Sequence, residues 1–233
     1  VSHMPEEAPI GTGCALATQC VTAYHAAILS QTLLPGEKVL IHAAAGGLGT
    51  ALVQIALWKG CTVIGVAGGS EKVEYLKNLG VHHVVDHHRI NWTDYVHQYL
   101  NGRVDVIFDN IGGSSIKKGK SVLAHGGRIV TLGAAALSGN KGKLNLIRLG
   151  LGFGFFSPIA YLSKSQSLIG VNMLKIADYR PDMLAESFKG VTTLHSKGIL
   201  NPHIGAIFNG TELDKAHAFL EGRASIGKVV VKW

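Results

Sequence analysis

The chain has 233 residues, of which 47% are hydrophobic and 16% are charged, with a formal net charge of +7 at pH 7. This length allows one large domain, or one domain with a part of a second, around a sizeable core. The basic residues are scattered, which favours a solvated basic surface over a nucleic-acid interface, with attraction of anionic cofactors or thioesters as a further reading. Three cysteines without CxxC spacing argue against a disulfide scaffold and favour a cytoplasmic protein.

Strand and helix patterns alternate along most of the chain. A first helix is expected over residues 19–34, ended by Pro35 and Gly36. The expected strands are 38–42, 61–66, 82–86, 104–109, 127–132 and 167–171, and the expected helices are 47–59, 70–79, 91–100, 113–123 and 175–197. Strands separated by helical patterns predict parallel βαβ units. Six strands fit an α/β Rossmann fold, a doubly wound parallel sheet of order 3-2-1-4-5-6 with its ligand at the carboxyl ends of the strands.

The alternation ends near residue 200. A strand is expected over 202–208, then a helix with Thr211 as its N-cap and Asp214 at its third position, and a final strand over 227–232. These elements are not expected to extend the parallel sheet. The predicted division is therefore an extension (1–18), an α/β domain (19–198) and part of a second domain (199–233).

The segment HAAAGGLG, from His42 to Gly49, is the most informative motif of the chain. It follows the first strand directly and opens a helical pattern. Gly46 and Gly47 permit a tight turn that a ligand can approach closely, and Gly49 lets the helix pack on the strand. The backbone N–H groups and the positive helix end would then face a pyrophosphate. In this context the motif predicts a dinucleotide site that includes Gly46, Gly47, Leu48 and Gly49.

The end of the second strand indicates which dinucleotide binds. Sites for NAD place a carboxylate there to hold the ribose hydroxyls. This chain has Ala67, Gly68 and Gly69 instead, followed by Ser70 and Lys72. A hydroxyl, an ammonium group and a helix N-terminus can converge on a phosphate, which favours NADPH over NADH. Two alternatives stay open: the neighbouring residue 71, a glutamate, partly offsets Lys72, or Lys72 is an ordinary solvated residue.

No residue pattern indicates a metal site or a nucleophile. Four of the twelve histidines cluster, at positions 82, 83, 87 and 88. The first two point to opposite faces of a strand, and no cysteine or second carboxylate completes a ligand set, so no metal is expected. Ser114 and Lys118, four positions apart, are interpreted as a helix-start serine and a solvated lysine. The catalytic residues remain unassigned.

The segment 144–162 is strongly apolar, but Arg148 and its glycine and proline breaks argue against a membrane span. A wall of an apolar pocket or a subunit contact is favoured. Ordinary core and a membrane-surface contact are the alternatives, and membrane contact is the least favoured.

These motifs resemble the zinc-independent quinone oxidoreductase (zeta-crystallin-like) branch of the medium-chain dehydrogenase/reductase superfamily. The matching segments are 22–26, 42–49, 70–72 with 79–80, 105–109 with 112–113, 127–130 with 132–134, and 226–230, while 140–175 is closer to the vesicle-amine-transport-protein-like branch. Members carry a further N-terminal region that this chain lacks. The resemblance therefore implies that residues 199–233 belong to an incomplete GroES-like substrate domain, and that this chain alone is inactive. In zinc-binding members a cysteine stands where an ungapped alignment places Thr18, and Cys20 is expected to be a packing residue.

The resemblance also implies specific cofactor contacts. Lys72 would be the main contact of the 2′-phosphate, with Ser70, and His87 stands where relatives often carry a tyrosine. Six residues would surround the nicotinamide half: Thr22, Asn110, Gly133, Ala134, Val171 and Asn172. Asn110 has a simple turn role as its alternative. A homodimer is implied, through edge pairing of the strand 167–171.

The expected function is an NADPH-dependent oxidoreductase. It would transfer hydride to a quinone or to an activated enone or enoyl double bond, so the partner is a small apolar electrophile. An enoyl-thioester or prostaglandin-type reductase is one alternative. A non-catalytic NADPH-binding module that interacts with a vesicle or membrane surface is another, and a zinc alcohol dehydrogenase is the least favoured.

Overall fold

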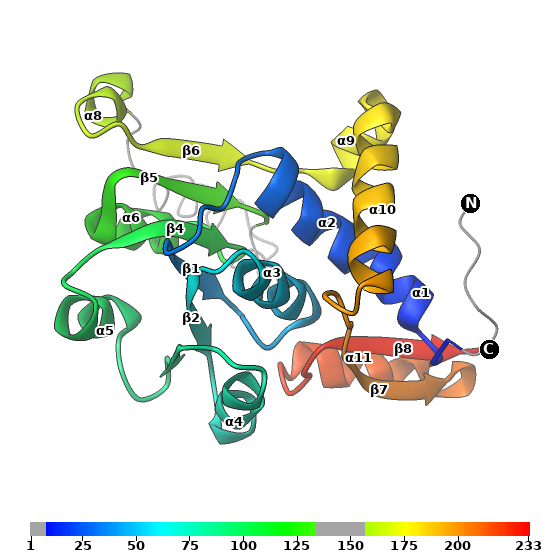
Figure 1. Ribbon diagram of the computed structural model, residues 1–233. Coiled ribbons are helices and arrows are strands. Elements are labelled where there is room, and N and C mark those ends of the chain that lie inside the picture. The colour runs from blue at the N-terminus through cyan, green and yellow to red at the C-terminus, as the bar shows by residue number, and fades with distance from the viewer. Residues whose placement is uncertain (1–7, 134–156) are drawn as a thin grey trace, which may run out of the picture.

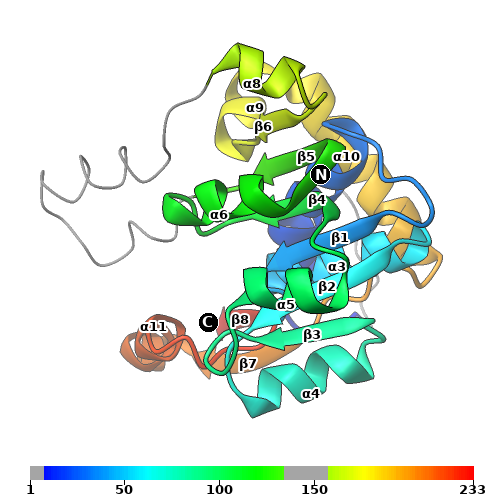
Figure 2. The same ribbon diagram turned by 90° about the vertical axis from the view of Figure 1, so that its left-hand side faces the viewer.

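The computed structural model describes residues 8–133 and 157–233. Six parallel strands form one sheet in the order β3-β2-β1-β4-β5-β6, so the predicted doubly wound fold is confirmed (Figure 2). The strands are β1 (Lys38–His42), β2 (Thr62–Ala67), β3 (His83–Asp86), β4 (Val104–Asp109), β5 (Leu123–Thr131) and β6 (Ser167–Gly170). Each predicted strand of the sheet is present, and the largest difference is at β5, which starts at Leu123 where the sequence predicts residue 127.

Helices cover both faces of the sheet (Figure 1). The helices along the sheet are α3 (Gly47–Trp58), α4 (Ser70–Asn78), α5 (Trp92–Tyr99), α6 (Ser114–Val122), α8 (Pro158–Leu162), α9 (Met173–Tyr179) and α10 (Pro181–Ser196). Alternate strand residues point to opposite faces, so Val39 and Ile41 join the core under α3 and α10, while Leu40 joins the core under α5 and α6. Two separate hydrophobic cores therefore fix the sheet from both sides.

The first helix differs from its prediction. It runs from residue 12 to residue 29 as α1 (Thr12–Ala15), α2 (Val21–Tyr24) and two π-helical segments, Leu16–Cys20 and His25–Leu29. Gly11, with a φ of 88°, precedes it without a side-chain cap. A start of this kind leaves no capping residue in the sequence, which is why the prediction began too late. π-helical segments are rare and often lie at functional sites.

The expected helix 175–197 is two helices. Arg180 leaves the helical region, with φ −137° and ψ 63°, and Pro181 begins α10. A proline has no N–H to donate to the preceding turn and restricts the residue before it, so α9 cannot continue through this point. The sequence contained this signal, and the prediction overlooked it.

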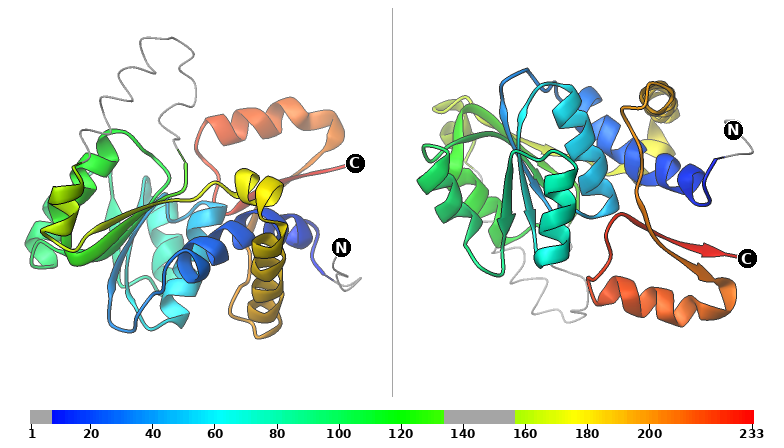
Figure 3. Two further views of the ribbon diagram at one scale, coloured as in Figure 1. Left: turned by 90° about the horizontal axis from the view of Figure 1, so that it is seen from above. Right: turned by 60° about the horizontal axis from the view of Figure 1, so that its bottom comes forward.

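The C-terminal strands form a two-stranded sheet and do not extend the main sheet. Strands β7 (Ile204–Asn209) and β8 (Lys228–Lys232) pair in parallel and are connected by α11 (Leu213–Glu221). This unit lies beside α1, at the start of the first helix (Figures 1 and 3). The predicted cap was wrong: Asn209 caps the turn, with Glu212 completing a capping box. The division at residues 18 and 198 stays a prediction.

Candidate functional site

The carboxyl ends of β1 and β4 lie side by side at the centre of the sheet. From β1 the chain enters α3, whose buried side chains join one core, and from β4 it enters α6, whose buried side chains join the other. In doubly wound sheets the point where consecutive connections change faces is where ligands bind. The residues of the glycine-rich turn meet the residues that follow β4 at this point.

The turn after β1 is shaped by close backbone packing. Gly46 donates its N–H to the Ala43 carbonyl oxygen at 2.9 Å, and Thr50 donates to the Gly46 carbonyl at 2.8 Å, which starts α3. A Cβ on Gly49 would collide with the Ala43 carbonyl oxygen and lie 2.7 Å from the Ala44 Cα, and one on Gly47 would collide with the Gln19 carboxamide. The left-handed residue of the turn is Ala43, with a φ of 48°, and Gly46 has an ordinary φ of −75°. Lack of space beside the backbone, and not a positive φ, therefore explains Gly49.

Buried polar side chains follow β1 and β4. His42 is fully buried, and its Nε2 lies 3.3 Å from the Ser115 Oγ. Burial lowers the His42 pKa to about 4, so the ring is neutral at pH 7. The Asp109 Oδ1 accepts the N–H groups of Ile111 and Gly112 at 2.7 and 2.8 Å, which holds the turn before α6.

Three buried atoms of this group lack partners in the described part of the chain: His42 Nδ1, Asp109 Oδ2 and Asn110 Oδ1. Buried polar atoms without hydrogen bonds are uncommon and call for an explanation. The Asn110 oxygen is an acceptor beside the predicted nicotinamide half of the site. A ligand donor there would satisfy it. The sequence analysis selected Asn110 but assigned no role to Asp109, although a polar residue at the end of a buried strand was a visible signal.

A carboxylate lies at the end of β2 after all, supplied by the neighbouring strand. Asp86 ends β3 in register with Ala67. Its Oδ1 accepts the N–H groups of Gly69 at 3.3 Å and His88 at 3.0 Å, and these bonds lower the Asp86 pKa. Arg89 lies 3.7 Å from its other oxygen. Asp86 lies 19 residues after Ala67, so no pattern at the end of β2 indicates it, and only strand pairing brings it there.

Lys72 faces the C-terminal unit. Its Nζ donates to the Arg223 carbonyl oxygen at 2.5 Å, in the turn between α11 and β8. Partial burial lowers the Lys72 pKa, while Glu71 acts in the opposite direction. Gly227, at the end of the same segment, donates its N–H to the Ala45 carbonyl at 2.8 Å. The segment 223–227 therefore borders both the predicted 2′-phosphate site and the glycine-rich turn, a contact that no local pattern could have indicated.

Four of the residues predicted around the nicotinamide half, Asn110, Gly133, Val171 and Asn172, follow the ends of β4, β5 and β6, whereas Thr22 lies in α2. Gly133 lies beside the Asn110 backbone: a Cβ added to this glycine would be 3.8 Å from the Asn110 carbonyl oxygen. Val171 donates its N–H to the Thr131 carbonyl at 2.9 Å, and the Asn172 side chain caps α9 by accepting from Lys175 at 3.3 Å. The Thr22 hydroxyl donates to the Thr18 carbonyl at 2.8 Å, within its own helix. Ala134 lies outside the described residues.

The position expected for a zinc-binding cysteine carries Thr18. Its hydroxyl donates to the Cys14 carbonyl oxygen at 2.9 Å. The Thr18 hydroxyl oxygen in turn accepts a hydrogen bond from the Lys228 Nζ at 3.4 Å. Cys20 is buried, which raises its thiol pKa to about 12 and agrees with a packing role. In residues 8–133 and 157–233 no three histidine, cysteine or acidic side chains gather as a metal site would require.

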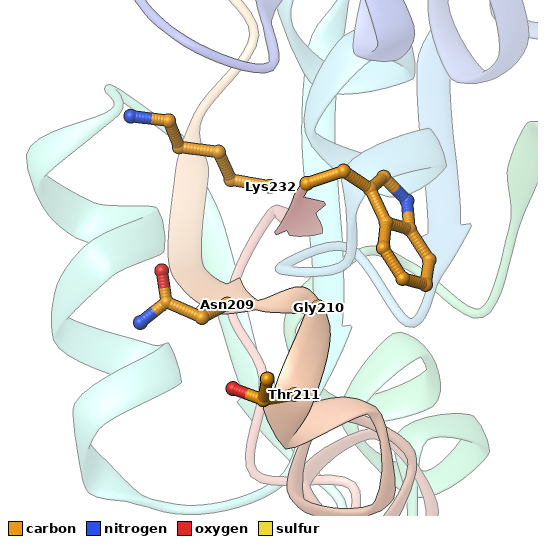
Figure 4. A pocket seen from close by; sticks show the side chains of 5 residues that line it. Asn209, Gly210, Thr211 and Lys232 are labelled. Carbon is orange, nitrogen blue, oxygen red and sulfur yellow. The ribbon is translucent and has the colours of Figure 1, made fainter.

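A surface hollow of about 370 Å³ lies on the C-terminal unit, where β7 and β8 end (Figure 4). It is lined by Asn209, Gly210, Thr211, Lys232 and Trp233. The Trp233 ring lies against Gly210 but is 92% exposed. This hollow contains none of the predicted site residues. In the described part of the chain no helix is long and apolar enough to cross a membrane, and most of the apolar segment 144–162 lies outside that part.

Comparison with known proteins agrees with this geometry. Residues 47–188 match the family described as zinc-binding dehydrogenase. Human quinone oxidoreductase is 28% identical over 99% of this chain, and the human synaptic vesicle membrane protein VAT-1 homolog is 31% identical over 98%. The chain spans 65% and 58% of these two proteins, respectively.

Solved structures show the same fold. The quinone oxidoreductase from Thermus thermophilus, solved alone and in complex with NADPH, is 28% identical with a TM-score of 0.79, over 100% of this chain and 69% of that one. With the family model matched over more than half of its length, the chain belongs to the zinc-binding dehydrogenase family and, within the medium-chain dehydrogenase/reductase superfamily, to the quinone oxidoreductase branch.

Proposed function

We propose that this chain is the NADPH-binding part of an oxidoreductase that reduces a quinone or an activated enone or enoyl double bond. The observation that carries the proposal is the junction of β1 and β4, where a close-packed glycine turn meets a buried acceptor, Asn110 Oδ1, that has no partner in the described residues. This arrangement fits a dinucleotide. When bound, the nicotinamide supplies the hydride.

The chain's own residues would bind and orient the cofactor. The backbone around Gly46, Gly47, Leu48 and Gly49 would receive the pyrophosphate at the start of α3. Asn110 would accept a hydrogen bond from the nicotinamide half, near Gly133. Thr22, Ala134, Val171 and Asn172 stay predicted contacts of the same half. No residue of this chain is assigned as proton donor.

Ser70, Lys72 and His87 would hold the 2′-phosphate. Asp86, the carboxylate at this end of the sheet, is already engaged by two backbone N–H groups and by Arg89. These partners fix the carboxylate and partly offset its charge, which reduces its repulsion of a 2′-phosphate. The positive charge of Lys72 would then favour a cofactor that carries the 2′-phosphate.

A calorimetric titration with NADPH and, separately, NADH tests the cofactor assignment. Micromolar NADPH binding and much weaker NADH binding are expected. Lys72→Ala should weaken NADPH binding by about tenfold and leave NADH unchanged, because of the two cofactors only NADPH carries the 2′-phosphate that the ammonium group would contact. Lys77→Ala, on the same helix, is the matched control and should bind like the unaltered chain. Tighter binding of NADH would overturn the assignment.

We expect the reaction to be independent of zinc. Thr18 offers no thiolate, and the ammonium group of Lys228 beside its hydroxyl disfavours a second cation. Metal analysis of the full-length protein checks this: stoichiometric zinc that is needed for turnover would contradict it.

A second function is favoured by the 31% identity with the synaptic vesicle membrane protein VAT-1 homolog. In that case the chain would be an NADPH-binding module that interacts with a vesicle surface. Turnover of a simple quinone by the full-length protein would argue against it. Binding to anionic vesicles that depends on residues 144–162, without turnover, would support it.

A further inference from the structure

Two imidazole rings lie together over the end of β2. The His87 and His88 rings are 4.5 Å apart, centre to centre, in an edge-on arrangement. Both reach the same place, since a Cβ built on Gly68 would lie 2.8 Å from the His87 Nε2 and 2.7 Å from the His88 Nε2. Two nitrogens thus converge on one point above a glycine, where a side chain would displace both.

Backbone hydrogen bonds place this pair. The His87 N–H donates to the Ala67 carbonyl at 2.9 Å, which extends the pairing of β3 with β2 by one residue. The His88 N–H donates to Asp86 at 3.0 Å, and the same carboxylate oxygen accepts from Gly69. The two imidazoles are therefore fixed relative to the start of α4, which carries Ser70 and Lys72. Both side chains are exposed, so a ligand can reach them.

The groups around His87 disfavour its protonation in the absence of a bound anion. Partial burial and the neighbouring His88 lower the His87 pKa, and Lys72 acts in the same direction, whereas Asp86 opposes them. Asp86 is itself engaged by Arg89 and by backbone donors. His42 is the other titratable group that interacts with His87, from the end of β1, and it is neutral. An incoming phosphate dianion would reverse this balance.

We propose that His88 joins His87 in holding the 2′-phosphate, and that the pair takes up a proton from solvent when this phosphate binds. The proton goes to an imidazole nitrogen, which then donates to a phosphate oxygen. The inference rests on the proposed function, because it requires the phosphate to bind beside Lys72. It makes the affinity for NADPH, but not for NADH, depend on pH between about 6.5 and 8.

Calorimetry of the full chain tests the proposal. NADPH is titrated at pH 7 in MOPS and in Tris, whose different ionisation enthalpies report the protons exchanged, and its affinity is measured from pH 6.5 to 8. Net uptake is expected, with an affinity about three- to tenfold weaker at pH 8 than at pH 6.5. A phosphate monoester has its second pKa near 6, so the ligand itself can only release protons on binding as a dianion. Uptake therefore reports on the protein.

Variants assign the uptake. His88→Gln should reduce the proton uptake, flatten the pH profile and weaken NADPH binding several-fold at pH 6.5, with NADH unchanged. His125→Gln is the matched control, because this exposed histidine lies near the amino end of β5. NADPH binding without proton uptake, or an equal loss for both cofactors in His88→Gln, would overturn the inference and leave the proposed function standing. If NADPH binds no more tightly than NADH at any pH between 6.5 and 8, the proposed NADPH-binding function would be wrong.

Discussion

At the scale of single residues, the centre of the site is built from polar groups that the fold buries. His42, Asp109 and Asn110 each leave one side-chain atom without a partner in the described residues. Each buried polar atom without a hydrogen bond lowers the free energy of unfolding by about 1–3 kcal/mol. Such a cost is typical of a site shaped for a ligand rather than for stability alone.

The buried His42 makes stability depend on pH. Its pKa is about 4 in the folded chain and 6.5 without the fold. The unfolded state therefore binds more protons below pH 6.5, so the stabilisation is complete above that pH and is lost as the pH falls toward 4. The urea midpoint should decrease between pH 7 and pH 5. His42→Gln should flatten this decrease, while His125→Gln should retain it; equal slopes for all three proteins would contradict the assignment.

At the scale of elements, the glycine-rich turn depends on how closely α3 approaches the end of β1. A methyl group at Gly49 would meet the carbonyl of Ala43 and the backbone of Ala44, which cannot rotate away as a flexible side chain can. Gly49→Ala should therefore lower the free energy of unfolding by at least about 2 kcal/mol and weaken binding of both NADPH and NADH.

Gly170→Ala is the matched control for this substitution. Nothing lies within 4 Å of a Cβ at Gly170, and its φ is not positive. Denaturant titrations of the two variants compare them directly. A Gly49→Ala variant as stable as Gly170→Ala would show that the close packing is not needed.

Element prediction succeeded where the pattern was local. The central strands β1, β2 and β4 were predictable because buried parallel strands are continuous apolar runs bounded by glycine or charged turns. The first helix was predicted too late because Gly11 provides no capping side chain, and the break before Pro181 was overlooked. The cap of the turn before α11 was assigned to Thr211 because two polar residues separated by one glycine offered the same signal, and the geometry selects Asn209.

At the scale of the whole molecule, the outer edge of the main sheet is apolar and exposed. β6 is the edge strand, and around it Ile159, Leu162, Leu174 and Tyr179 are each more than 70% exposed. Unpaired strand edges with exposed apolar neighbours favour association. This is the edge through which the sequence analysis expected a homodimer.

We expect the chain to dimerise through this edge. Ile159→Glu with Leu174→Glu should shift the protein to monomer at micromolar concentration, because dimerisation would bury both charges. Sedimentation velocity measures this. Leu220→Glu, on α11, changes an exposed leucine far from β6 and should leave the dimer intact. A dimer that survives the double substitution, or a chain that is monomeric from the start, would rule out this interface.

Local sequence patterns were enough to predict the six strands, the glycine-rich turn and the cofactor end of the sheet, because each lies within a short strand, turn and helix segment. What surrounds this end of the sheet depends on contacts between distant segments. Strand pairing brings Asp86 to the end of β2, and the docking of the C-terminal unit brings Arg223 to Lys72 and Lys228 to Thr18. These contacts join residues up to 210 positions apart. Such contacts leave no periodic pattern in the sequence, because they join segments that are far apart along the chain.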